Sequence, residues 1–164
     1  MKSLLIVNGP PGVGKTAACE RLYRQIENSV WLDGDWCWMM NPFTANEENK
    51  RMVEDNITHL LRNFLTNSKL EMVIFSWVIP RAEVFDIVLG PLADLSFNLQ
   101  RITLVCSPEE LRRRMIAGGR EEHKVQKSTS TLPGYLDMDT FQLDTTVLSP
   151  DEAATAILKL LTAQ

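Results

Sequence analysis

The chain has 164 residues and a formal net charge of -4 at pH 7, with 45% hydrophobic and 23% charged residues. A chain of this length fits one domain, and its near-average composition argues against extended disorder and against a membrane-spanning run. The net negative charge argues against a protein that wraps nucleic acid through a general positive field.

The amino terminus carries a short apolar run, and the chain contains three cysteines. The run over residues 4–7 ends at Asn8, which is too short for the core of an export signal. Cys19, Cys37 and Cys106 are an odd number without a Cys-x-x-Cys pair, as is typical of a reducing compartment. We therefore expect a buried strand at the start of a cytoplasmic protein.

Apolar runs of strand length alternate along the chain with segments of helical pattern. The runs are Leu4–Val7, Val30–Leu32, Met72–Ile79, Ile102–Val105 and Phe141–Leu143. This alternation predicts an α/β fold, in which a parallel sheet has helices on both faces. We expect a single domain over residues 1–164.

Helix signals lie between these runs. Apolar residues recur every three or four positions between Asn46 and Asn67, which predicts one long helix. Residues 107–110 and 149–152 each place a serine cap before a proline, with a glutamate at the third helical position. The polar, glycine-bearing segment over residues 118–134 is too long for an ordinary connection, so we expect a mobile lid there.

A phosphate-binding loop is the strongest motif. Residues 9–16 read Gly-Pro-Pro-Gly-Val-Gly-Lys-Thr, which satisfies Gly-x4-Gly-Lys-Thr between a predicted strand and a helical segment. Backbone amides of such a loop converge on a β-phosphate, with Lys15 between the β- and γ-phosphates and the Thr16 hydroxyl on magnesium. A glycine-rich turn with a chance lysine is the alternative. The residues expected to bind nucleotide here are Gly9, Pro11, Gly12, Val13, Gly14, Lys15, Thr16 and Ala17.

Other motifs narrow the class of P-loop protein. The chain has no Asn-Lys-x-Asp sequence, which disfavours a GTPase. The run Met72–Ile79 contains no acidic residue, so the usual Walker B aspartate is missing there. An ATPase that activates water with an acidic pair after that strand is therefore disfavoured.

Two carboxylates follow the second predicted strand, in Asp33-Gly34-Asp35. Residues two apart in extended chain point to the same side, so both could face the crevice where open α/β sheets bind ligands. We assign Asp33 to magnesium and Asp35 to the proton of an attacking hydroxyl. A polar turn that only closes the strand is the alternative.

Arginines and aromatic residues suggest the remaining parts of a site. Arg120 follows a glycine pair and could swing over the phosphates as an arginine finger, while Arg114 could stack on the base. For the triplet Arg112–Arg114, a solvated helix face is the alternative. Trp36 opens an aromatic and methionine-rich stretch over residues 36–43 that could wall an acceptor pocket or pack in the core.

In the order of these parts the chain resembles the P-loop small-molecule kinases, namely the shikimate, gluconate, adenylylsulfate and chloramphenicol kinases and the nucleoside monophosphate kinases. Residues 32–35 are similar to the strand-two motif of adenylylsulfate kinase. Residues 79–81 are similar to the strand-three ending of adenylate kinases, whose arginine holds the acceptor. The resemblance implies the strand order 2-3-1-4-5, Asp35 as the base and Arg81 as an acceptor ligand.

These features predict an ATP- and magnesium-dependent phosphotransferase for a small-molecule acceptor, acting as a monomer or homodimer. The expected catalytic residues are Lys15, Asp35 and Arg120, and the expected substrate residues are Asp35, Trp36 and Arg81. A nucleoside monophosphate kinase and a nucleotide-binding regulator without turnover are the alternatives. Nucleotide kinases commonly use several arginines for the acceptor phosphate, whereas only Arg51 and Arg62 lie between Asp35 and Arg81.

Overall fold

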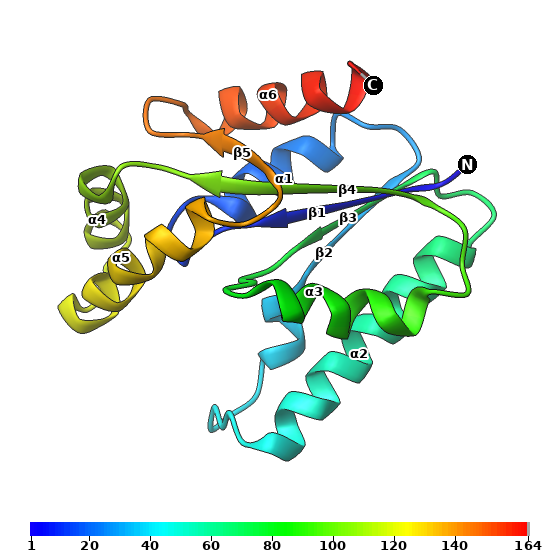
Figure 1. Ribbon diagram of the computed structural model, residues 1–164, viewed down its shortest axis with the longest axis horizontal. Helices are drawn as coiled ribbons and strands as arrows, with labels where there is room; N and C mark the ends of the chain where they lie inside the picture. Colours follow the sequence, from blue (N-terminus) through cyan, green and yellow to red (C-terminus); the bar gives the residue numbers. More distant parts are fainter. Residues whose placement is uncertain (164) are drawn as a thin grey trace.

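A single parallel sheet forms the centre of the computed structural model, which describes residues 1–163 (Figure 1). Its five strands lie in the order β2-β3-β1-β4-β5, as the resemblance implied. The strands are β1 (Ser3–Asn8), β2 (Ser29–Asp33), β3 (Met72–Ser76), β4 (Asn98–Val105) and β5 (Phe141–Asp144). The third strand ends three residues earlier than predicted, because residues 77–79 leave the sheet.

Helices cover both faces of the sheet, as predicted (Figure 1). One face carries α1 (Lys15–Tyr23) and α6 (Pro150–Thr162), which pack on each other. The other face carries α2 (Glu47–Thr66) and α3 (Ala82–Leu89). Two short 3-10 helices, η1 (Gly34–Trp38) and η2 (Gly90–Leu92), follow β2 and α3.

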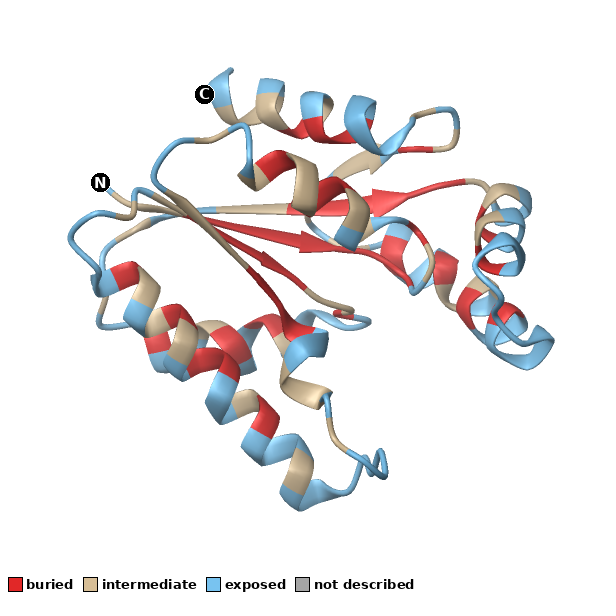
Figure 2. Cartoon of the chain, turned by 180° about the vertical axis from the view of Figure 1, so that it is seen from behind, coloured by how far each residue is buried: buried red, intermediate tan, exposed pale blue. Residues whose placement is uncertain are grey.

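Figure 2 shows that buried residues lie mainly in the strands and along the helices that cover them. The core has two layers because alternate residues of a strand point to opposite faces. In β1, Leu5 and Val7 pack with α1 and α6, whereas Leu4 and Ile6 pack with α2 and α3. All four side chains are fully buried, so the first strand has no solvent face. Such a strand reads as a continuous apolar run, which explains why the sequence pattern located it.

The predicted helix starts are confirmed by their caps. Side chains of Asn46, Ser107 and Ser149 each accept a hydrogen bond from a backbone amide in the first turn of α2, α4 (Pro108–Ala117) and α6. Ser149 and Glu152 form the full reciprocal capping box. These local hydrogen bonds fix where each helix begins, and hence where the loops at the carboxyl edge of the sheet end.

The segment expected to be an irregular lid is mostly helical. After α4 (Pro108–Ala117), a short turn leads into α5, which spans Glu122–Leu136. Its buried side chains are spaced by three and four positions and are Val125, Ser128, Leu132 and Tyr135. The hydroxyls of Thr129, Ser130 and Thr131 donate to carbonyls three or four residues earlier. These hydroxyls therefore find their hydrogen-bond acceptors within the helix.

Loops at the carboxyl ends of the strands gather at one edge of the sheet. In Figure 1, η1, α4 and α5 lie beyond the arrowheads, while both chain termini lie at the opposite edge. Parallel sheets bring all these loops to one side, which is where ligands of open α/β sheets bind. Within residues 1–163, no helix combines the length and apolar character needed to cross a membrane.

Candidate active site

The loop between β1 and α1 adopts a conformation that requires glycine. Gly9 has φ = 148°, and a Cβ atom there would lie 2.6 Å from the Leu104 carbonyl oxygen of β4. Gly12 has φ = 86°, and a Cβ atom there would collide with Met115 of α4. Both positions therefore exclude a side chain by backbone strain and by close packing.

Lys15 folds back onto its own loop. Its Nζ donates hydrogen bonds to the carbonyl oxygens of Gly9 and Pro10, at 2.7 and 3.0 Å. Desolvation lowers the pKa of Lys15 to about 8, against the opposing effects of Asp35 and then Asp33. The carbonyls thus hold an ammonium group that an anionic ligand in the loop could attract.

Thr16 joins the start of α1 to the end of β2. Its Oγ1 donates to Oδ2 of Asp33 at 2.8 Å, and Oδ1 of the same carboxylate accepts from the backbone N–H of Asp35 at 3.0 Å. Asp33 is buried. A hydroxyl and a carboxylate in contact offer two oxygen ligands of the kind that Mg²⁺ takes beside phosphate oxygens and water.

Asp35 lies in η1 rather than in extended chain. The two-residue alternation used to pair it with Asp33 does not apply there, and the capping hydrogen bond keeps the two residues together instead. Desolvation and the charge of Asp33 raise the pKa of Asp35, while Lys15 and Arg120 act in the opposite direction. A raised pKa makes a carboxylate a stronger base.

Arg120 follows the turn between α4 and α5, where Gly119 has φ = 75°. Its charge acts on Asp35, so the structure brings the two side chains to the same region. Two contacts hold the surrounding segment: Arg112 forms a two-pronged ion pair with Glu122 at 2.6 and 3.0 Å, and Ser128 Oγ donates to the Pro11 carbonyl at 2.6 Å. The second contact ties α5 directly to the phosphate loop.

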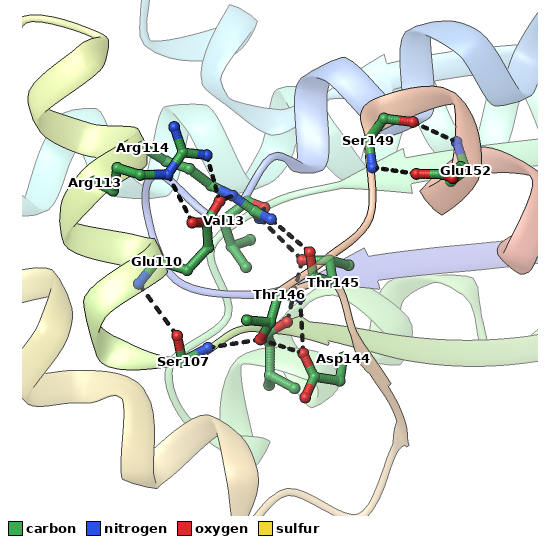
Figure 3. A network of polar contacts seen from close by, with 11 residues as sticks. Val13, Ser107, Glu110, Arg113, Arg114, Asp144, Thr145, Thr146, Ser149 and Glu152 are labelled. Atoms are coloured by element: carbon green, nitrogen blue, oxygen red, sulfur yellow. Dashed lines mark hydrogen bonds and ion pairs between the residues drawn. The ribbon is translucent and has the colours of Figure 1, made fainter.

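Arg114 crosses from α4 to the loop after β5, as Figure 3 shows. Its Nη1 donates to the carbonyl oxygen of Val13 at 2.9 Å and to Oγ1 of Thr145 at 3.0 Å. Its Nε donates to Glu110 at 2.7 Å, and hydrogen bonds from Arg113 and then Arg114 lower the pKa of Glu110 to about 2. The guanidinium is therefore fixed at the junction of three segments.

A pocket of about 280 Å³ opens beside this junction. Its lining includes Val13, Gly14, Arg113, Arg114, Leu148 and Pro150. Arg112 is not among the lining residues, since it pairs with Glu122. The sequence pattern marked Pro150 only as part of a helix start and did not single out Thr145 or Leu148, although a loop at the carboxyl end of β5 had to reach this edge of the sheet.

Trp36 and Arg81 occupy different places. The Trp36 ring packs edge-on against Trp31, with centroids 4.8 Å apart, and borders a shallow pocket beside Tyr23 and Arg24 on the α1 side. Arg81 is the exposed residue directly before α3.

Ala17, the last of the residues expected to bind nucleotide, lies in α1, where its carbonyl accepts a hydrogen bond from Arg21.

The chain is similar in fold to P-loop kinases of known structure. The tunicamycin resistance protein of Deinococcus radiodurans matches over 98% of this chain and 96% of its own, with a TM-score of 0.71 and 17% identity. The APS kinase of Mycobacterium tuberculosis, solved with AMPPNP and APS, matches over 98% of each chain, with a TM-score of 0.71 and 16% identity. A gluconokinase from Sinorhizobium meliloti matches over 98% of this chain and 94% of its own, with a TM-score of 0.68 and 17% identity.

A family model described as an AAA domain matches residues 5–133. No curated protein matches the chain. The structural likenesses establish a P-loop kinase fold, so the resemblance drawn from the order of motifs is confirmed at that level.

Proposed function

The chain belongs to the AAA domain family, and from this membership and the geometry of its site we propose that it is an ATP-dependent phosphotransferase for a small-molecule acceptor. The observation that carries the proposal is the hydrogen bond between Thr16 and Asp33. It places the end of the phosphate loop against the end of β2, two residues before Asp35. This contact supports the proposal that the groups for binding the nucleotide and for accepting the proton act at one place.

In the proposed reaction, an acceptor hydroxyl attacks the γ-phosphorus of ATP. The new bond joins the acceptor oxygen to phosphorus, the bond from phosphorus to the β,γ-bridging oxygen breaks, and ADP leaves with that oxygen. Asp35 takes the proton of the hydroxyl, a role that its raised pKa favours. The products are a phosphorylated acceptor and ADP.

Three further groups serve the same reaction. Lys15 leaves the Gly9 and Pro10 carbonyls and bridges the β- and γ-phosphates. Arg120 stabilises the charge on the transferred phosphoryl group. Thr16 and Asp33 would hold Mg²⁺, which supplies charge neutralisation at the phosphate oxygens.

The pocket between Arg114 and Pro150 would take the base of ATP. It opens against Val13 and Gly14 of the phosphate loop, so one ligand can span both sites. APS kinase, which shares this fold, was solved with the ATP analogue AMPPNP. We place the protein in the cytoplasm, where ATP is present and where its unpaired Cys19, Cys37 and Cys106 would stay reduced.

ADP release in the presence of ATP and Mg²⁺ tests the proposal. A panel of hydroxyl compounds and nucleoside monophosphates is offered to the wild-type protein and to Lys15→Ala. We expect turnover with a hydroxyl compound that Lys15→Ala abolishes, because the variant lacks the charge between the phosphates. Unchanged turnover in the variant overturns the assignment. Preferred transfer to a nucleoside monophosphate would make the protein a nucleotide kinase, and ATP binding without any ADP release would make it a regulator.

A further inference from the structure

The acceptor side of the site is built around η1. In a 3-10 helix, residues three apart lie on the same side, so Asp35 and Trp38 share one face of η1. Trp36 lies on another side, against Trp31. By this spacing we expect the ring on the face of Asp35 to be that of Trp38 rather than that of Trp36.

Two more rings extend this surface. Phe43 packs against Trp38, with ring centroids 5.6 Å apart and an angle of 51° between the planes. Trp77, which follows β3, lies directly over Gly34, where a Cβ atom would come within 2.5 Å of its ring. We name these three rings, Trp38, Phe43 and Trp77, the aromatic wall.

Large apolar side chains in the wall and beside it are also left in water. Met39 is 80% exposed and Phe43 is 66% exposed. Both lie on the segment that leads from η1 to α2, within eight residues of Asp35. Exposing neighbouring large apolar groups costs free energy, and such clusters mark binding surfaces. Here the cluster adjoins the proposed base.

The basic side chains between Asp35 and Arg81 either form ion pairs or lie elsewhere in the fold. Lys50 pairs with Glu47 at 2.7 Å, and Arg62 pairs with Asp94 through two hydrogen bonds. Arg51 borders a pocket with Glu54 and Ile87 between α2 and α3. Lys69 lies in the turn before β3, at the opposite edge of the sheet. Apart from Arg81, which is exposed directly before α3, and Arg120, whose charge acts on Asp35, the side of the site that carries the aromatic wall is thus poor in cations available to a phosphate group.

From this juxtaposition of Asp35 with the aromatic wall, we infer that the acceptor is a hydroxyl compound with an apolar, ring-bearing body and no phosphate group. The inference rests on the proposed function and specifies its substrate class. The ring lies against Trp38 and Phe43 while the hydroxyl reaches Asp35. The transfer itself is the one described above, with the proton passing to Asp35 and ADP leaving.

Three probes with one common diol test the inference: glycerol, glycerol 3-phosphate and 3-phenoxypropane-1,2-diol. They differ only in a hydroxyl, a phosphate or a phenoxy group at the third carbon. ADP release from ATP is measured with each, and the ratio of kcat/KM values is compared. We expect the phenoxy compound to exceed glycerol about tenfold or more, as burial of a phenyl-sized surface would give. Glycerol 3-phosphate should not exceed glycerol.

Two variants test whether Phe43 is responsible for the preference for the phenoxy compound over glycerol. Phe43→Ser changes an exposed side chain, so the fold should survive, and the ratio between the phenoxy compound and glycerol should fall about tenfold or more. Phe141→Ser is the matched control, since Phe141 is 52% exposed at the start of β5, away from the carboxyl edge. Its ratio should equal that of the wild type.

A kcat/KM ratio of one or less in the wild type overturns the inference, and so does the absence of ADP release with both compounds. Preference for glycerol 3-phosphate overturns it as well. ATP binding and slow hydrolysis by water are measured in the same samples. If ATP is bound and hydrolysed while the ratio is one, only the substrate class is wrong. If ATP is not bound, the proposed function itself has failed.

Discussion

Asn8 holds both backbone polar groups of Ile79. Its Nδ2 donates to the Ile79 carbonyl at 2.9 Å, and its Oδ1 accepts from the Ile79 N–H at 2.7 Å. The side chain is fully buried, one residue before the phosphate loop. Ile79 stands two residues before Arg81, so this pair sets the distance between the loop expected to bind phosphate and the segment expected to bind the acceptor.

Replacing Asn8 tests this connection. Asn8→Leu leaves the buried N–H and C=O of Ile79 without partners, at about 1–3 kcal/mol for each group, so the free energy of unfolding should fall by at least about 2 kcal/mol. Urea denaturation measures it. Asn98→Leu, which changes an exposed asparagine on β4, serves as the control and should stay within about 0.5 kcal/mol of the wild type. Equal stability of the two variants would show that the pair contributes nothing.

The two acids of residues 33–35 should respond differently to amide substitution. Asp35→Asn keeps the shape but cannot accept a proton, so kcat should fall about a hundredfold or more while ATP binding survives. Asp33→Asn weakens a proposed magnesium ligand, so a higher Mg²⁺ concentration should restore part of its activity. A magnesium titration of kcat/KM with an accepted substrate measures both. Near-normal transfer by both variants would make the pair structural.

The pKa of Lys15 predicts how ATP affinity depends on pH. Bound triphosphate favours the charged ammonium, whereas in the free protein the pKa of Lys15 is about 8. Above pH 8, binding must therefore take up a proton, and the Kd should rise up to about tenfold for each pH unit. Isothermal titration calorimetry between pH 7 and about pH 10 measures this. Lys15→Arg stays charged over this range and should give a flat profile.

The same depressed pKa affects stability without ligand. Between pH 8 and 10.5 the unfolded chain keeps a proton on Lys15 that the folded chain has lost. The unfolded state then binds more protons, so the contribution of Lys15 to the free energy of unfolding should rise with pH over this window. Thermal melts of the wild type against Lys15→Met isolate this contribution, and parallel pH profiles would rule it out.

Arg120 should act on the rate rather than on binding. If it stabilises charge that develops only during transfer, Arg120→Ala should lower kcat about a thousandfold or more with little change in ATP affinity. Arg112→Ala, which breaks the ion pair with Glu122 instead, is the comparison. A defect in Arg120→Ala that is confined to KM would make Arg120 a ground-state binding residue.

Features with a local signal could be predicted from the sequence. The runs that became β1 to β4 contain buried side chains, and the serine caps of α4 and α6 act within a single turn. The strand order came only from the resemblance to a family. The helix α5 was missed because its polar composition concealed the spacing of Val125, Ser128 and Leu132.

Relationships across the chain could not be predicted. Asn8 and Ile79 are 71 positions apart, and Arg114 meets Thr145 across 31 positions. No local pattern encodes such pairs. The orientation of Trp36 and Trp38 depended on a 3-10 turn after Asp33, whereas the sequence argument assumed extended chain. One change of backbone conformation therefore decides which tryptophan shares a face of η1 with Asp35.

The distribution of tryptophan in this fold has a spectroscopic consequence. All four residues lie in β2, η1 or directly after β3, at positions 31, 36, 38 and 77. Trp31 donates its indole N–H to Ser76, and Trp38 and Trp77 belong to the aromatic wall. None lies in α4, α5 or the loop after β5. Tryptophan fluorescence therefore originates in β2, in η1 and directly after β3, so an acceptor can be titrated without a label while the half proposed to hold the adenine ring contributes no tryptophan signal.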